Sequence, residues 1–197
     1  MLKTKNPTLL KTARLISDFF NPLTSLLIYF IIFSVRNYTF KETVSVFLPI
    51  LLILILPVAG WIVWNVKTGR YTNMDVSNRV QRKSLYNFIG MMFAGFLAYD
   101  YFVNGKIDLV MVFILVLLIM MQLSNYFIKS SMHTAFNVFV SALFFVLNPV
   151  LGLIWLFISF VVGLTRVMLN RHSPKEVIAG FAIAVVVSFV YLYTNFG

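Results

Sequence analysis

Five ionisable side chains gather near the end of a chain that elsewhere avoids charge. The stretch TRVMLNRHSPKEVIAG at 165–180 holds Arg166, Arg171, His172, Lys175 and Glu176. The whole sequence has only six acidic residues and two histidines. His172 and Glu176 are four residues apart at the expected start of a helix, so the carboxylate can hold one imidazole nitrogen. The other nitrogen is then available for nucleophilic attack, and the pair is a candidate catalytic dyad.

Two further polar stretches are expected at the same membrane face. They are DVSNRVQRKS at 75–84 and KSSMHTAFN at 129–137, and the second contains the other histidine, His133. Two expected crossings separate each stretch from the next, so all three can converge with 166–176 on one side. Two histidines in cationic loops on one face favour a functional site over two isolated structural histidines.

The remaining candidates suit a tetrahedral anion. Arginines and a lysine would supply fixed positive charge, and a serine at the opening of a helix would add its hydroxyl beside backbone N–H groups. These phosphate-binding candidates are Arg79, Arg82, Lys129, Arg166 and Ser131. Ordinary alternatives exist: Ser131 as an N-cap, Glu176 as a partner of the helix dipole, and a cationic loop that faces lipid headgroups. We prefer the headgroup role for Arg171 and Lys175.

The composition of the chain indicates whether it folds in water or in a lipid bilayer. Sixty per cent of the residues are hydrophobic, 21 are phenylalanine and only 11% are charged; the mean hydropathy is +0.91. These values predict an integral membrane protein. The absence of cysteine excludes disulfides and thiolate chemistry. The net charge of +10 is better explained by lipid headgroups than by nucleic acid, and the sequence calls for no cofactor.

Apolar segments and turn signals predict an all-α fold, a polytopic membrane helix bundle with about six to seven transmembrane helices. Helix is expected because open strands would leave backbone groups unsatisfied in lipid. Asn21-Pro22 predicts a kink, VNGK at 103–106 a turn, and Asn148-Pro149 a break between two short helices. The segments are about 15–35, 44–66, 84–104, 107–128, 131–147, 149–167 and 173–195.

Loop charge predicts the orientation and the location. The start of the chain, 1–20, is basic and amphipathic and is expected to lie at the interface before the first span. Most lysines and arginines fall on the face that carries the polar stretches, which the positive-inside rule makes cytoplasmic. We expect one multi-pass domain, 1–197, in the cell (inner) membrane. On the crowded face are Lys3, Lys5, Lys11, Arg14, Lys67, Arg70, Arg79, Arg82, Lys83, Lys129, Arg166, Arg171 and Lys175; on the other are Arg36, Lys41 and Lys106.

The polar stretches resemble the motifs of a known family, the type 2 phosphatidic acid phosphatases or PAP2 superfamily. The family's third motif is Ser-Arg, five residues, His, three residues, Asp. This chain has Thr165-Arg166, five residues, His172, three residues and Glu176. Glutamate keeps the carboxylate of the family's aspartate and adds one methylene.

The other two motifs match in part. The second motif, Pro-Ser-Gly-His, corresponds to Ser130-Ser131-Met132-His133, which keeps the serine and the histidine. The first, Lys, six residues, Arg-Pro, keeps Arg82, while Asp75 stands at the lysine position. Arg79 or Lys129 is expected to replace the missing charge. The resemblance covers roughly 75–190, with a PAP2-like core in 67–197 and extra spans in 1–66.

The resemblance implies a metal-independent phosphatase that works through a phosphohistidine. His172 would be the nucleophile, Glu176 would hold its far N–H, and His133 would protonate the leaving group and then activate water. Arg82, Ser131 and Arg166 would hold the non-bridging oxygens, with Arg79 and Lys129 as supplements. The implied substrate is a phosphate monoester or diphosphate of a lipid or polyprenyl carrier in the bilayer.

Other functions remain open. A membrane polyprenyl or alcohol phosphotransferase would need magnesium on clustered aspartates, and none of the four aspartates is paired at helical spacing. A small anion or lipid transporter could use the same cationic pocket without chemistry, and so could a catalytically inactive PAP2-like protein. The sequence does not indicate an oligomeric state.

Overall fold

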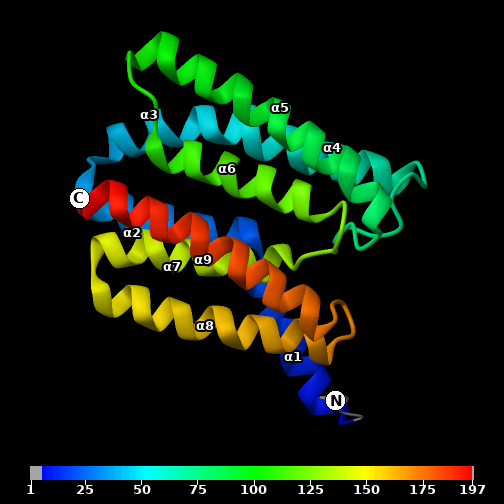
Figure 1. The fold of residues 1–197 in the computed structure, drawn as a ribbon. Coiled ribbons are helices and arrows are strands. Elements are labelled where there is room, and N and C mark those ends of the chain that lie inside the picture. Colours follow the sequence, from blue (N-terminus) through cyan, green and yellow to red (C-terminus); the bar gives the residue numbers. More distant parts are fainter. Residues whose placement is uncertain (1–5, 197) are drawn as a thin grey trace. The chain divides into compact units, whose positions relative to one another are not determined.

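The computed structural model describes residues 6–196, and every regular element in that range is a helix (Figure 1). The all-α expectation is confirmed for these residues. Lys3 and Lys5, counted among the cations of the crowded face, lie outside them. In chain order the elements are α1 (Pro7–Phe19), α2 (Pro22–Asn37), α3 (Phe40–Pro49), the π-helix η1 (Ile50–Ile55), α4 (Leu56–Lys67), α5 (Arg79–Asn104), α6 (Leu109–Ser124), α7 (Met132–Leu147), α8 (Pro149–Met168) and α9 (Pro174–Phe196).

Within residues 6–196, three helical stretches are long and apolar enough to cross a membrane. They are Phe40–Lys67, Pro149–Met168 and Pro174–Phe196, and the bent pair α1–α2 raises the number to four if it forms one span. The helices α6 and α7 are apolar but have 16 residues each, fewer than a span of about 20 needs. The described residues therefore support a multi-pass membrane protein with three to four candidate spans, and six to seven stays a prediction.

The predicted breaks occur where the sequence places them. The chain bends by 56° between α1 and α2, where Asn21 Oδ1 accepts from Thr24 N at 3.0 Å. Asn148 separates α7 from α8, and its Oδ1 accepts from Val150 N at 2.9 Å, which makes it the N-cap of α8. Gly105 ends α5 with φ +66°, a left-handed conformation that glycine adopts without steric cost.

The stretch between Phe40 and Lys67 contains a π-helix that the sequence did not predict. In η1 the hydrogen bonds widen, so that Leu56 N reaches Leu51 O. Pro57 follows directly and has no N–H for the preceding turn, and its ring crowds the carbonyl four residues earlier. A local π-turn relieves that crowding without interrupting the span.

The chain packs as two compact units, which are described separately. The first consists of the described parts of Met1–Arg36 and Phe127–Gly197, and the second is Asn37–Tyr126. The first unit is thus built from two distant pieces of sequence. The expected division of a single domain, between 1–66 and 67–197, stays a prediction.

Helix α7 is the core of the first unit. Every residue from His133 to Phe144 is buried, and α8 and α9 pack against it (Figure 1). Glycines allow the close approaches: a Cβ at Gly152 would lie 2.7 Å from Phe145 Cα, and a Cβ at Gly180 would lie 2.6 Å from Ser131 O. Small residues at such contacts are typical of helices that associate in membranes.

Candidate functional site

The start of α9 holds the candidate dyad in a defined geometry. Glu176 Oε2 accepts from Ser173 N at 3.0 Å, and Ser173 Oγ accepts from Glu176 N at 3.3 Å, which is a capping box. The same Oε2 lies 3.0 Å from His172 Nδ1. The His172 side chain is 1% exposed and that of Glu176 is 21% exposed. An ionised carboxylate accepts only, so Nδ1 carries the proton and chemistry at this ring has to use Nε2.

The turn between α8 and α9 fixes the histidine relative to Arg166. The carbonyl oxygen of Arg166 accepts from Arg171 N at 3.0 Å and from His172 N at 3.2 Å. Asn170 supplies the left-handed residue with φ +54°, a role that asparagine tolerates better than most residues. The five residues between Arg166 and His172 therefore form one turn at the end of α8, which is closed by the hydrogen bonds to Arg166 O.

Ser131 brings the start of α7 to the same place. Its backbone N–H donates to Glu176 O at 3.0 Å, so α7 and α9 begin side by side. Its Oγ accepts from Thr134 N at 3.4 Å and from Thr134 Oγ1 at 3.0 Å. The N-cap role considered for Ser131 is thus present. In both bonds the serine oxygen accepts, so its own proton can be donated to a ligand.

His133 lies in the first turn of α7 in front of a buried polar network. The residue is 8% exposed, and its carbonyl accepts from Asn137 Nδ2 at 2.8 Å. The amide of Asn137 also donates to Phe20 O at 2.8 Å and accepts from Ser25 Oγ at 2.9 Å and Trp155 Nε1 at 3.2 Å. Asn137 therefore joins the α1–α2 bend to α7 and α8. It was not among the predicted residues, although an amide inside an apolar run is a recognisable signal.

Arg166 is held by the first helix of the chain. It is 3% exposed, and its Nη1 donates to Ser17 Oγ at 2.9 Å. Ser17 is fully buried in α1. The segment 1–66 thus supplies a contact to a candidate site residue, which the sequence did not indicate. Lys129 contacts the turn between α8 and α9, because its Nζ donates to Arg171 O at 3.2 Å.

The other two arginines lie at the start of α5 in the second unit. Arg82 is 5% exposed, and its Nε donates to Val76 O at 3.0 Å. Val76 has φ +43°, a strained conformation for a β-branched residue. Arg79 donates from Nε to Asn125 O at 2.7 Å and from Nη2 to Tyr126 O. Arg79 therefore caps the C-terminal end of α6, and the phosphate-binding roles of both arginines stay predictions.

The first unit thus brings together His172, Glu176, Ser131 and the backbone of Arg166, with His133 two residues along α7 from Ser131. Both α7 and α9 begin here, and helix N-termini favour negatively charged ligands. Within residues 6–196 no three His, Asp or Glu side chains come together as metal ligands. Comparison with protein-family models, with curated proteins and with solved structures gave no match.

The approach of α9 to Ser131 gives a testable prediction. Gly180→Ala is expected to destabilise the protein by about 1–3 kcal/mol, because the new Cβ would meet backbone atoms that cannot rotate away. The start of α9 would have to move off the start of α7. The midpoint of thermal unfolding in detergent measures the loss of stability.

Gly90→Ala is the matched control for this prediction. Gly90 lies inside α5, and a Cβ there would meet nothing within 4 Å. Alanine is the better helix former by about 1 kcal/mol, so this variant should be neutral or stabilised. Equal stability of the Gly180 variant and the parent would show that α7 and α9 are farther apart than described.

Proposed function

We propose that this protein is an integral membrane phosphatase of the PAP2 type, hydrolysing a phosphate monoester or diphosphate of a lipid or polyprenyl carrier. The observation that carries the proposal is the buried His172 whose Nδ1 lies 3.0 Å from the carboxylate of Glu176. A second support is the position of this dyad at the paired starts of α7 and α9. A carboxylate held against one imidazole nitrogen orients the ring and leaves the other nitrogen as the nucleophile, which is the arrangement that histidine attack requires.

In the proposed first step Nε2 of His172 attacks phosphorus. The N–P bond forms as the bond between phosphorus and the leaving oxygen breaks, and His133 gives its proton to that oxygen. The imidazole becomes positively charged, and Glu176 stabilises this charge through Nδ1–H. The Ser131 hydroxyl, Arg166 and the two helix N-termini would balance the negative charge on the phosphoryl oxygens.

In the second step His133 takes a proton from water. The resulting hydroxide attacks phosphorus, the N–P bond breaks, and its electron pair returns to Nε2. Inorganic phosphate leaves and both histidines regain their starting protonation. No metal is needed, because the nucleophile is a side chain and fixed positive groups supply the charge.

Phosphate release by the purified protein tests this proposal. We expect detergent-solubilised protein to release phosphate from one or more members of a panel of lipid phosphates and diphosphates. Activity should survive EDTA and be inhibited by vanadate, which mimics five-coordinate phosphorus. Loss of activity in EDTA that magnesium restores would contradict the phosphohistidine mechanism. Phosphate binding without release from any substrate would favour the transporter or the inactive scaffold instead.

The role of His133 is tested by changing the leaving group. His133→Ala should lower phosphoenzyme formation from a lipid phosphate by about 10²- to 10⁴-fold, because a lipid alkoxide needs a proton to leave. An activated aryl phosphate leaves without that help, so its phosphoenzyme should form almost normally. The intermediate should then accumulate, because the same histidine activates water. Rapid-quench measurement with labelled substrates gives both rates.

Equal losses with both substrates would mean that His133 binds phosphate or maintains structure. Asn137→Asp offers a comparison, because it alters the network behind His133 without removing the imidazole. Phosphate trapped on His133 would reverse the assignment of the two histidines.

A further inference from the structure

Helix α1 packs on the first unit with a narrow face. Ala13 and Ser17 are its buried residues, 3% and 0% exposed, and they lie one turn apart. Ser17 Oγ accepts from Arg166 Nη1 at 2.9 Å, which ties this face to the end of α8. A helix of 13 residues is only marginally stable by itself. The docked position of α1 therefore also depends on what contacts its other sides.

The opposite side of α1 carries a cationic stripe beside an apolar one. Lys11 and Arg14 are exposed and three residues apart, so they share one side of the helix. Leu15 and Phe19 are 64% and 57% exposed and four residues apart. Asp18 is the acidic residue of α1, which keeps a net positive charge. Exposed cations beside exposed apolar side chains are typical of helices that lie in the membrane interface.

The contacts of the last turn place the rest of α1 at the membrane surface. Ser17 contacts Arg166 in the last turn of α8. Phe20, just beyond α1, packs edge-on against Trp155 with ring centroids 5.7 Å apart, about three turns earlier on α8. The chain therefore goes deeper into the bundle after Ser17, and α1 leads outward before it. The cationic stripe precedes Ser17 by about 5 to 9 Å along the helix, which places it at the depth of the headgroups.

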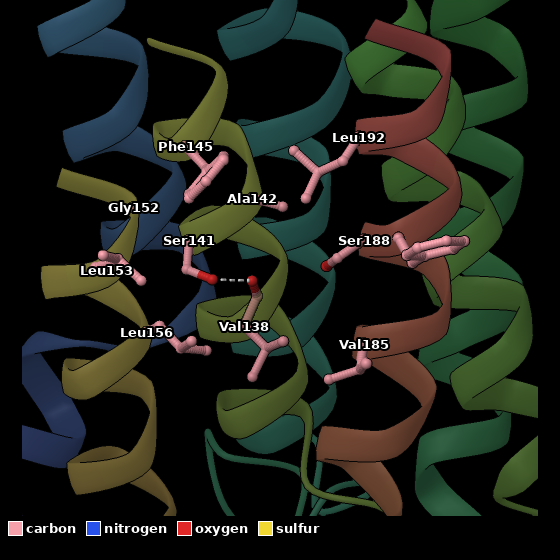
Figure 2. Close-up of a pocket in the computed structure, with 11 residues that line it drawn as sticks. Val138, Ser141, Ala142, Phe145, Gly152, Leu153, Leu156, Val185, Ser188 and Leu192 are labelled. Carbon is pink, nitrogen blue, oxygen red and sulfur yellow. Dashed lines mark hydrogen bonds between the residues drawn. The ribbon is translucent and has the colours of Figure 1, made fainter. Parts of the chain in front are cut away.

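The charge of α1 sets it apart from another open surface of the first unit. Figure 2 shows a pocket that α7, α8 and α9 line with apolar side chains and the hydroxyls of Ser141 and Ser188. No charged residue is among the lining residues. Such a lining does not distinguish one hydrocarbon from another, whereas the cations of α1 distinguish anionic from zwitterionic headgroups.

We infer that the exposed face of α1 binds the anionic surface of a bilayer, and that this contact holds Ser17 against Arg166. The cationic stripe meets anionic headgroups while Leu15 and Phe19 enter the apolar boundary below them. Each cation near such a surface favours binding by about fivefold. Lipid that contacts the docked helix shifts the population of α1 toward the docked state. The inference does not rest on the proposed phosphatase function.

Thiol labelling in vesicles tests the inference. The chain contains no cysteine, so Ala13→Cys places one thiol on the buried face of α1 and leaves Ser17 unchanged. This thiol reacts with N-ethylmaleimide when α1 moves off the unit. Labelling should be at least about fivefold slower in phosphatidylcholine mixed with phosphatidylglycerol than in phosphatidylcholine alone. Lys175→Cys, an exposed position at the start of α9, corrects for the effect of surface charge on a thiol.

Further substitutions in the Ala13→Cys protein identify the groups responsible. Lys11→Ala combined with Arg14→Ala should make the two labelling rates equal, because the cationic stripe is lost. Lys106→Ala is the matched control, an exposed cation in the turn after α5, and should keep the difference between the lipids. Ser17→Ala should speed labelling at least about tenfold in both kinds of vesicle, because the hydrogen bond to α8 is lost.

Hydrogen exchange of the parent protein is a second measurement that needs no substitution. The amides of α1 should exchange at least about fivefold more slowly in bilayers that contain phosphatidylglycerol. Equal exchange in the two bilayers would overturn the inference, and so would a loss of the lipid effect in Lys106→Ala. A disulfide between two copies through Leu15→Cys, together with exchange that ignores the lipid, would assign this face to a second copy instead.

Discussion

His172→Ala is expected to abolish phosphoenzyme formation with every substrate and to lower turnover by at least about 10⁴-fold. The imidazole is the proposed nucleophile, and its removal leaves the phosphoryl group without an attacking atom. An activated leaving group does not help, which separates this variant from His133→Ala. Acid-quenched, labelled protein measures the intermediate, and steady-state phosphate release measures turnover.

Two neighbours provide matched controls for His172→Ala. Arg171 and Lys175 flank the dyad and are exposed, so Arg171→Ala and Lys175→Ala should retain activity close to that of the parent. Unfolding in detergent should show that all three variants fold. A His172→Ala protein that still forms a phosphoenzyme would remove this residue from the nucleophile's role.

Glu176→Gln is expected to lower turnover by about 10²- to 10⁴-fold in a protein that still folds. Glutamine keeps the shape but loses the charge that stabilises the imidazolium, and its amide can also favour the wrong imidazole tautomer. The fall should appear in kcat, because the charge on His172 develops during the reaction. Steady-state kinetics with a lipid phosphate and with an aryl phosphate measure it.

Glu176→Asp distinguishes catalysis from helix capping. Aspartate restores the residue of the PAP2 motif and keeps the charge at the start of α9, but its shorter side chain does not match the 3.0 Å contact to Nδ1. We expect partial activity in a protein that still folds. If Glu176→Gln behaves like the parent, the carboxylate serves the capping box with Ser173 and the helix dipole only.

The sequence predicted the parts of the fold that local chemistry controls. Asn21-Pro22 and Asn148-Pro149 break helices because proline cannot continue the hydrogen-bond ladder and asparagine caps the next turn. The contact between His172 and Glu176 was also predicted, because i and i+4 side chains meet on a helix. Each of these signals lies within four residues.

Long-range contacts were not predictable in the same way. Ser17 and Arg166 are 149 residues apart, and nothing in the spacing of either residue indicates the other. The π-helix before Pro57 was not predicted. A proline in an apolar run can break a helix, kink it or be accommodated by a π-turn, and packing selects one of these. Arg79 was predicted to bind phosphate because of its positive charge. In the structure its guanidinium donates to the carbonyls of Asn125 and Tyr126, and the spacing of residues in the sequence does not predict these contacts.

The hydrogen bonds of Asn137 fix the order in which parts of the first unit can assemble during synthesis. Ser25 and Asn137 are 112 residues apart, so the α1–α2 bend is synthesised well before the amide that it hydrogen-bonds. At typical translation rates the delay is roughly 6 to 22 s. During this interval α2 has to wait in the translocon or the bilayer with a hydroxyl that lacks its final acceptor. The first unit therefore closes only after the C-terminal helices have been made, and a chain that stops between 37 and 126 lacks the helices against which α1 and α2 pack.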